Sequence, residues 1–174
     1  AGRTLGILGS GTLGQGVARI AGAFGMTVLR GEHKGSAAVR AGYVPFERVI
    51  CEADVISLHC PLTAATRHLI GAVELAALKP GALLINTARG GLVDEQALAD
   101  ALRAGRIGGA GFDVLSEEPP RDNPLLAADL LEAGNFILTP HVAWSSREAM
   151  QVLAEQLIDN IEAFVAGAPR NRVA

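Results

Sequence analysis

A short glycine-rich segment constrains this chain more than any other part of its sequence. The apolar run Leu5–Leu8 leads directly into Gly9-Ser10-Gly11-Thr12-Leu13-Gly14, and a segment with helical periodicity, Leu13–Phe24, follows. A GxGxxG pattern alone is weak, but a strand before it and a helix after it are the setting in which such a turn binds a dinucleotide. The helix N-terminus offers free N–H groups and a partial positive charge to phosphates. The sequence therefore predicts a pyrophosphate-binding turn at residues 9–14.

Each glycine of this turn has its own predicted role, and an acidic residue completes the pattern. Gly9 permits the tight turn, Gly11 lets a pyrophosphate approach the backbone, and Gly14 lets helix and strand pack closely. Glu32 follows the second predicted strand, where a carboxylate can bind both ribose hydroxyls and repels a 2′-phosphate. This favours NAD over NADP, although the two residues after Glu32 are basic and would suit a phosphate. The alternative is that the glycines serve only a tight turn and Glu32 is a surface charge.

Short apolar runs alternate with helical segments along the whole chain. The predicted strands are Leu5–Leu8, Thr27–Leu29, Val55–Leu58, Ala82–Ile85, Gly111–Val114 and Phe136–Leu138. The predicted helices are Leu13–Phe24, Phe46–Glu52, Ala72–Leu78, Glu95–Ala104 and Arg147–Val165. Strands that alternate with helices imply right-handed crossovers and a parallel sheet covered on both faces. We predict an α/β fold with a doubly wound, Rossmann-like parallel sheet in three α/β/α layers, forming one dinucleotide-binding domain over residues 1–174.

Turn and cap signals agree with these boundaries. Asp94 precedes a helical stretch as an N-cap residue does, and Gly105 and Gly167 follow helical stretches as C′ glycines do. The proline-rich segment Glu117–Asn123 is predicted to be a surface loop before the last strand.

The charge balance excludes some classes of partner. Lys and Arg number 15 and Asp and Glu number 18, for a net charge of −3, which argues against nucleic acid or a membrane surface. The chain has neither an apolar run of membrane-spanning length nor a signal-peptide pattern at its start, so a cytoplasmic location is expected. Cys51 and Cys60 form no disulfide framework and no metal site, and we expect both to be buried as small apolar residues.

Four later segments begin at the carboxyl ends of predicted strands. They are His59–Arg67, Ile85–Gly91, Gly111–Pro120 and Thr139–Trp144. In an open parallel sheet this edge is where ligands bind. Arg89, Glu118 and His141 can therefore converge there although they are far apart in the sequence.

These three side chains together suggest a reaction that none of them indicates alone. The Arg89 guanidinium suits a carboxylate and can polarise a neighbouring carbonyl, although it could be a surface arginine near the acidic pair Asp94-Glu95. His141 suits acid–base work near neutral pH, but a lone histidine after a strand is more often structural, and Glu118 alone would be a solvated loop charge. A glutamate paired with a histidine favours imidazolium, which can protonate a carbonyl oxygen as a hydride reaches the carbon. In the oxidative direction, neutral histidine takes the hydroxyl proton.

With these residues present, the chain resembles the D-isomer-specific 2-hydroxyacid dehydrogenase family over nearly its whole length. The matching segments are PLT at 61–63, NTARGG at 86–91, FDV with EPP between 112 and 120, and PH at 140–141, in family order and spacing. The resemblance is to the cofactor-binding domain of that family. The run Ala143–Ala149 is most similar to its glycerate dehydrogenase (hydroxypyruvate reductase) branch.

The resemblance implies an NAD-dependent oxidoreductase and roles for particular residues. Arg89 would bind the substrate carboxylate and polarise the carbonyl, His141 would be the acid–base, and Glu118 would orient and charge His141. Asp113 would hold the nicotinamide carboxamide. The positions that match cofactor contacts are Gly9, Gly11, Thr12, Leu13, Gly14, Glu32, Cys60, Pro61, Thr66, Thr87, Ala88, Arg89, Asp113, His141 and Ala143.

The resemblance also leaves alternatives open. The substrate domain of the family is absent from this sequence, so we expect the chain to bind NAD(H) and to turn over small 2-hydroxy or 2-keto acids poorly. A homodimer is expected for a longer parent protein. A non-catalytic NAD-binding module or an NAD-sensing, corepressor-like dimer are the alternatives to an enzyme. Glu118 disfavours formate dehydrogenases, which have glutamine there, whereas a phosphite dehydrogenase-like activity shares the same three residues.

Overall fold

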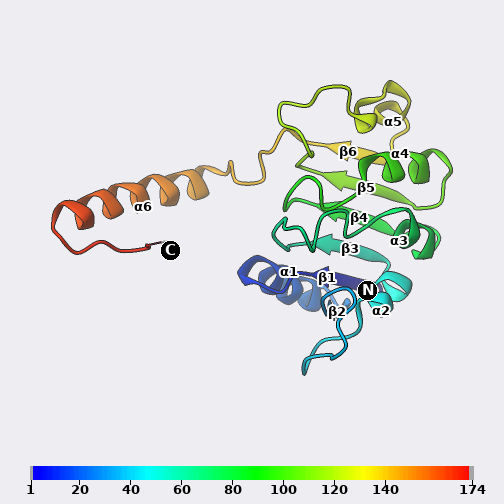
Figure 1. Cartoon of the computed structure of the whole chain (residues 1–174), viewed down its shortest axis with the longest axis horizontal. Helices are drawn as coiled ribbons and strands as arrows, with labels where there is room; N and C mark the ends of the chain where they lie inside the picture. Colours follow the sequence, from blue (N-terminus) through cyan, green and yellow to red (C-terminus); the bar gives the residue numbers. More distant parts are fainter. Residues whose placement is uncertain (1, 173–174) are drawn as a thin grey trace. The chain divides into compact units, whose positions relative to one another are not determined.

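The computed structural model describes residues 2–172, which fall into two compact units (Figure 1). The first unit ends at Pro140 and the second begins at His141. The sequence predicts one domain over residues 1–174, and the structure divides this stretch after Pro140. Ala1, Val173 and Ala174 of the predicted domain lie outside the described residues.

The first unit is built on one six-stranded sheet in the order β2-β1-β3-β4-β5-β6. All neighbouring strands are parallel. The chain passes from β1 outward to β2, then returns across β1 to β3 and continues to the other edge, which confirms the predicted doubly wound sheet. The strands are β1 (Thr4–Leu8), β2 (Thr27–Gly31), β3 (Val55–Leu58), β4 (Leu83–Asn86), β5 (Gly109–Phe112) and β6 (Phe136–Leu138).

Helices cover the two faces of this sheet unequally. On one face, Leu5 and Ile7 of β1 pack with Ala18 and Ala21 of α1. Within residues 2–140, α1 is the one helix on that face, and Ile137, which shares it by strand register, stays 67% exposed. The other face carries the larger core cluster and four helices. The helices of this unit are α1 (Thr12–Ala23), α2 (Phe46–Glu52), α3 (Ala72–Ala77), α4 (Glu95–Arg103) and α5 (Ala128–Glu132).

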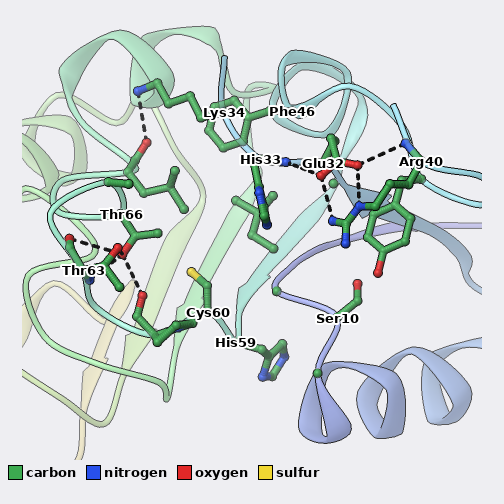
Figure 2. Close-up of a pocket in the computed structure, with 18 residues that line it drawn as sticks. Ser10, Glu32, His33, Lys34, Arg40, Phe46, His59, Cys60, Thr63 and Thr66 are labelled. Atoms are coloured by element: carbon green, nitrogen blue, oxygen red, sulfur yellow. Dashed lines mark hydrogen bonds and ion pairs between the residues drawn. The ribbon is translucent and has the colours of Figure 1, made fainter. Parts of the chain in front are cut away.

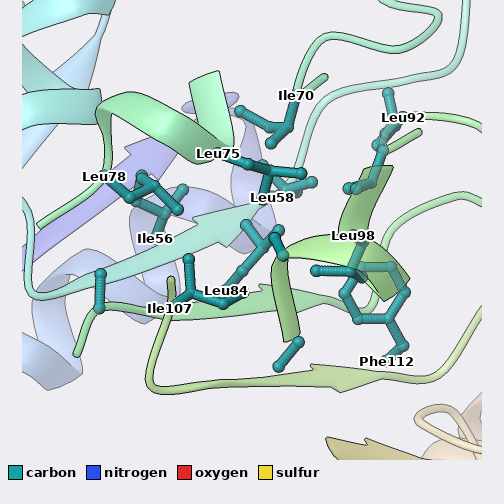
Figure 3. Packing of buried hydrophobic residues seen from close by; sticks show 14 of the residues in the cluster. Ile56, Leu58, Ile70, Leu75, Leu78, Leu84, Leu92, Leu98, Ile107 and Phe112 are labelled. Atoms are coloured by element: carbon teal, nitrogen blue, oxygen red, sulfur yellow. The ribbon is translucent and has the colours of Figure 1, made fainter. Parts of the chain in front are cut away.

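The larger cluster packs β3, β4 and β5 against α3 and α4 (Figure 3). Ile56, Leu58 and Leu84 of the sheet are fully buried, as are Leu75 and Leu98 of the two helices. Burying each such side chain stabilises the fold by about 1.5–3 kcal/mol relative to leaving it in water. This packing fixes the strand ends from which the site loops leave.

The fifth strand is displaced from its predicted position. The sequence predicts Gly111–Val114, and the structure forms β5 over Gly109–Phe112. A Cβ on Gly109 would lie 2.5 Å from the Asn135 carbonyl oxygen, so a glycine is needed where β5 passes the start of β6. The apolar pattern missed this segment because its residues are small, and the shift places Asp113 just beyond the strand end.

A helical segment between β5 and β6 was not predicted. Pro124–Leu126 form a 3-10 turn and α5 follows it, with Leu125 and Leu130 buried in the larger cluster. Both elements are too short to show helical periodicity in the sequence.

The predicted caps are confirmed. Asp94 Oδ1 accepts a hydrogen bond from the Ala97 N–H at 3.0 Å. Gly105 and Gly167 follow α4 and α6 with positive φ angles of 62° and 76°.

The second unit holds α6 (Arg147–Val165), which begins at the predicted residue. No helix within residues 2–172 is long and apolar enough to cross a membrane.

Two glycines in α1 should respond in opposite ways to the same substitution. A Cβ on Gly14 would lie 2.1 Å from the Gly9 carbonyl oxygen, whereas a Cβ on Gly16 would meet no atom within 4 Å. We expect G14A to lower the free energy of unfolding by about 1–3 kcal/mol through overpacking. G16A should raise it by about 0.5–1 kcal/mol through helix propensity. Urea unfolding measures both, and equal stability of the two variants would contradict the close packing of α1 on the turn.

Candidate functional site

The site lies at the carboxyl edge of the sheet, where β1 separates β2 from β3. The loops after β1 and β3 leave in opposite directions there, which opens a crevice in doubly wound sheets. A pocket of about 560 Å³ occupies this place (Figure 2). Its walls come from the loop after β1, the end of β2 with the segment that follows, and the loop after β3.

The glycine turn has the geometry that its sequence predicts. Gly9 has φ +96°, and a Cβ there would lie 2.4 Å from the Cys60 backbone nitrogen. Gly14 is buried against the turn, as described above. A Cβ on Gly11 would meet no atom within 4 Å. The packing of the described residues therefore requires glycine at positions 9 and 14, whereas position 11 is open toward a ligand.

This turn contains polar groups that could bind an anion. Ser10 lines the pocket, and its buried Oγ has no hydrogen-bond partner among the described residues. Gly11 caps α1 without a side-chain hydrogen bond, so the first N–H groups of the helix receive no side-chain acceptor from their cap. A hydroxyl and helix N–H groups beside an open Cβ position suit the oxygens of a pyrophosphate.

Glu32 lies at the end of β2 and lines the pocket, where its carboxylate is almost fully buried. Arg40 Nε and Nη2 each donate to one carboxylate oxygen at 2.7 Å. The backbone N–H groups of His33 and Arg40 donate at 2.9 and 3.1 Å. The Arg40 side chain, followed by the His33 backbone, lowers the pKa of Glu32 from 4.5 to about 2. The carboxylate that we expected to receive ribose hydroxyls is thus ionised and held by the protein.

Lys34 is also held, on the far side of the same pocket (Figure 2). Its Nζ lies 2.8 Å from Glu74 Oε1 and donates to the Leu69 carbonyl at 3.3 Å. The ammonium also lies 5.6 Å from the centre of the Phe46 ring. Glu74 in turn accepts from the Gly71 N–H at the start of α3, so Lys34 is tied to that helix end.

The loop after β3 is ordered by a threonine. Thr66 Oγ1 donates to the Pro61 carbonyl at 2.7 Å and accepts from the Thr63 N–H at 2.8 Å. Cys60 lines the pocket half-buried, and this burial raises the pKa of its thiol. Cys51 is exposed on α2, so the expectation that both cysteines are buried is wrong for Cys51: this position of the short helix faces outward.

The loop after β4 carries Arg89. Buried Asn86 closes this loop, because its side chain accepts from the Ala88 N–H at 3.1 Å and donates to the Arg89 carbonyl at 2.9 Å. Thr87 lies exposed between them. The Arg89 guanidinium is exposed and donates to the Ala88 carbonyl at 2.7 Å. The acidic pair Asp94-Glu95 has other partners, so it does not explain Arg89.

The loops after β4 and β5 touch each other. A Cβ on Gly90 would lie 1.8 Å from the Leu115 carbonyl oxygen, so only glycine permits this contact. Asp113 is buried directly after β5, and its Oδ1 accepts a hydrogen bond from the Thr139 hydroxyl. The structure therefore brings the Arg89 loop beside the loop that leads to Glu118.

Glu118 lies in a loop that the buried carboxylate of Glu95 contacts at two points. The Glu118 carboxylate itself accepts from the Leu115 N–H through Oε1, at 2.9 Å. Glu95, at the start of α4, accepts from the Ser116 N–H and Oγ at 2.7 and 2.6 Å and from Asn123 Nδ2 at 2.7 Å. The proline-rich segment is thus a surface loop, as predicted, that is pinned before and after Glu118.

His141 is the first residue of the second unit and follows Pro140 directly. Its backbone has a positive φ of 54°, and its carbonyl accepts from Trp144 Nε1 at 2.8 Å. Ala143 belongs to the same short segment. The pairing of His141 with Glu118 stays a prediction.

The pocket is lined by some of the residues predicted to contact the cofactor and by others that were not predicted. Of the predicted cofactor positions, Gly9, Gly11, Glu32, Cys60, Pro61 and Thr66 line it. Thr12, Leu13 and Gly14 lie in α1, whereas Thr87, Ala88, Arg89 and Asp113 lie in the loops after β4 and β5. His141 and Ala143 belong to the second unit. Sequence reasoning missed Ser10, Arg40, Tyr43 and His59, which also line the pocket. Ser10 could have been found inside the glycine turn, whereas Arg40 lies in an irregular segment whose pattern gives no signal.

The Glu32 interaction should give a measurable pH dependence. The pKa of the Glu32 carboxyl is about 2 in the folded chain, compared with 4.5 for an ordinary glutamate. The ionised group therefore stabilises the fold fully above the higher value, and this contribution falls as pH drops from 4.5 toward 2. We expect the difference in unfolding free energy between wild type and E32Q to shrink through that window. A difference that stays constant in urea titrations down to about pH 2 would contradict the Arg40 contact.

Comparison with known proteins agrees with this geometry. Residues 1–143 match the D-isomer specific 2-hydroxyacid dehydrogenase family, NAD binding domain. Over 174 residues the chain is 55% identical to a glycerate dehydrogenase of Methylorubrum extorquens, covering 99% of this chain and 53% of the relative.

Solved structures show the same likeness. A D-lactate dehydrogenase from Aquifex aeolicus, complexed with NAD and lactic acid, has a TM-score of 0.85 and 34% identity, covering 95% of this chain and 54% of that one. An acyclic imino acid reductase in complex with NADPH and D-Arg has a TM-score of 0.83 and 40% identity, covering 99% and 54%. The chain spans about half the length of these relatives. It belongs to the D-isomer-specific 2-hydroxyacid dehydrogenase family, of which it carries the NAD-binding domain.

Proposed function

We propose that this chain is the cofactor-binding part of an enzyme that interconverts a small D-2-hydroxy acid and its 2-keto acid, of the glycerate–hydroxypyruvate or glyoxylate type. One observation carries the proposal. The open glycine turn and the loops bearing Arg89 and Glu118 follow strands of one parallel sheet and lie along its carboxyl edge. The likeness to a glycerate dehydrogenase supports the choice of substrate class.

The residues of the turn fit a dinucleotide. The pyrophosphate would lie against Gly9, Ser10 and Gly11 at the N-terminus of α1, where the open Cβ position and the unpartnered hydroxyl are found. The adenosine ribose would lie toward Glu32 in the pocket. Asp113 is buried at the end of β5, where it would receive the nicotinamide carboxamide. When bound, NAD(H) supplies or accepts the hydride.

The chain's own residues would handle the substrate and the proton. Arg89 is exposed on a closed loop, so its guanidinium can bind the substrate carboxylate and polarise the carbonyl beside it. His141 would protonate the carbonyl oxygen in reduction and take the hydroxyl proton in oxidation. Glu118, in the loop that Glu95 pins, would favour the imidazolium form of His141.

Partners and location follow the same reasoning. A small 2-hydroxy or 2-keto acid is the proposed substrate, and a homodimer is proposed for a longer parent protein. The lack of nucleic-acid or membrane partners stays a prediction from the charge balance. The cytoplasmic location also stays a prediction.

The 174-residue chain should bind NADH and turn over hydroxypyruvate or glyoxylate slowly. Arg89 and Glu118 are exposed in it, so water is not excluded from the reacting groups. NADH fluorescence titration and the loss of NADH absorbance with either keto acid measure the two properties. Absence of NADH binding would refute the proposed function, and rapid turnover would refute the need for a further domain.

A matched pair of variants makes the binding test specific. G11A adds a methyl group at the open position where the pyrophosphate would approach. We expect it to weaken NADH binding about tenfold or more, because the pyrophosphate would lose at least one hydrogen bond to the turn. G16A adds the same group five residues later, within α1 and also in open space, and should leave affinity unchanged. Equal NADH affinity of G11A and wild type would place the pyrophosphate elsewhere.

A further inference from the structure

Arg40 supplies most of the hydrogen bonds to Glu32 (Figure 2). Four N–H groups reach the two carboxylate oxygens, and three of them belong to Arg40: Nε and Nη2 at 2.7 Å and the backbone N–H at 3.1 Å. A carboxylate has about four lone-pair positions, so this set satisfies it. Arg40 thus commits its guanidinium in a bidentate contact to the residue expected to choose between NAD and NADP.

This contact changes the charge at the ribose end of the pocket. An isolated carboxylate would repel a 2′-phosphate, but the Glu32–Arg40 pair is neutral overall. The Arg40 side chain remains 55% exposed while that of Glu32 is 4% exposed, so the cation is the solvent-facing member of a pair that lines the pocket. The guanidinium carbon also lies 4.1 Å from the centre of the Tyr43 ring, which supports the planar group from a second side.

The other neighbouring cation is committed to a different element. Lys34 lies against Glu74 and the Leu69 carbonyl, at distances of 2.8 and 3.3 Å. Glu74 is fixed in turn by the Gly71 N–H. Removing the Glu32 charge would therefore release Arg40 and leave the contacts of Lys34 in place.

We propose that Arg40 is a second determinant of nucleotide preference, held by Glu32 in the native chain and able to bind a 2′-phosphate when that carboxylate is absent. The proposal rests on the proposed binding of a dinucleotide in this pocket. A guanidinium pairs with phosphate through two parallel N–H groups, the same geometry that it now uses on Glu32. Glu32 would accordingly disfavour NADP by withholding Arg40 from the 2′-phosphate, because the charges of the pair cancel.

The test is a set of dissociation constants for NADH and NADPH, measured by fluorescence titration on the full chain. The variants are E32Q, E32Q/R40M and E32Q/K34M. We expect E32Q to bind NADPH about tenfold or more tightly than wild type, because a charge-assisted pair with phosphate forms. E32Q/R40M should lose that gain in NADPH affinity. E32Q/K34M removes one positive charge from another part of the same pocket and should keep most of the gain.

Each other outcome would overturn the assignment. A gain that survives in E32Q/R40M would show that Arg40 does not contact the phosphate. A gain lost equally in both double variants would show that net charge alone decides. No gain in a folded E32Q, checked by circular dichroism, would also refute it.

A single variant keeps the test independent of E32Q folding. R40M in the native background should weaken NADPH binding more than NADH binding, and an unchanged ratio of the two constants would contradict the proposal. Failure of the proposed function itself is distinguishable, because wild type would then bind neither nucleotide.

Discussion

Three backbone contacts that leave no room for a Cβ atom hold the carboxyl edge of the sheet together. A Cβ on Gly9 would lie 2.4 Å from the Cys60 nitrogen, one on Gly14 2.1 Å from the Gly9 oxygen, and one on Gly90 1.8 Å from the Leu115 oxygen. They join the β1 loop to the β3 loop, α1 to the turn, and the β4 loop to the β5 loop. Because backbone atoms cannot rotate away as side-chain ends can, these contacts fix the loops relative to one another without a ligand.

The two ends of this edge differ in how complete they are. At the end where we propose that the adenosine binds, the protein forms a pocket and satisfies its buried carboxylate with Arg40 and His33. At the other end Arg89 and Glu118 stand on ordered loops but are exposed. This division matches a chain that spans about half the length of its relatives and carries the NAD-binding domain of the family. We therefore expect this chain to bind the cofactor more readily than it catalyses the reaction.

What the sequence predicted depended on local patterns. Alternating apolar runs and helical periods gave the six parallel strands and most helices, and Asp94 is the cap that its position indicated. The start of β5 was missed because its residues are small, and glycine is required at position 109 by Asn135, a contact 26 residues away that no local pattern records. The contacts of buried Glu95 and of exposed Arg40 were missed for the same reason, since their partners are set by how loops fold back onto the sheet.

The most direct measurement of the central claim is an NADH titration of the chain followed residue by residue through backbone amide chemical shifts. We expect the largest shifts at Ser10, Gly11 and Thr12 of the turn, with smaller shifts at Glu32 and none at Gln96 on the outer side of α4. Shifts confined to α3 and α4, with the glycine turn unchanged at saturating NADH, would contradict the assignment of the turn as the pyrophosphate site.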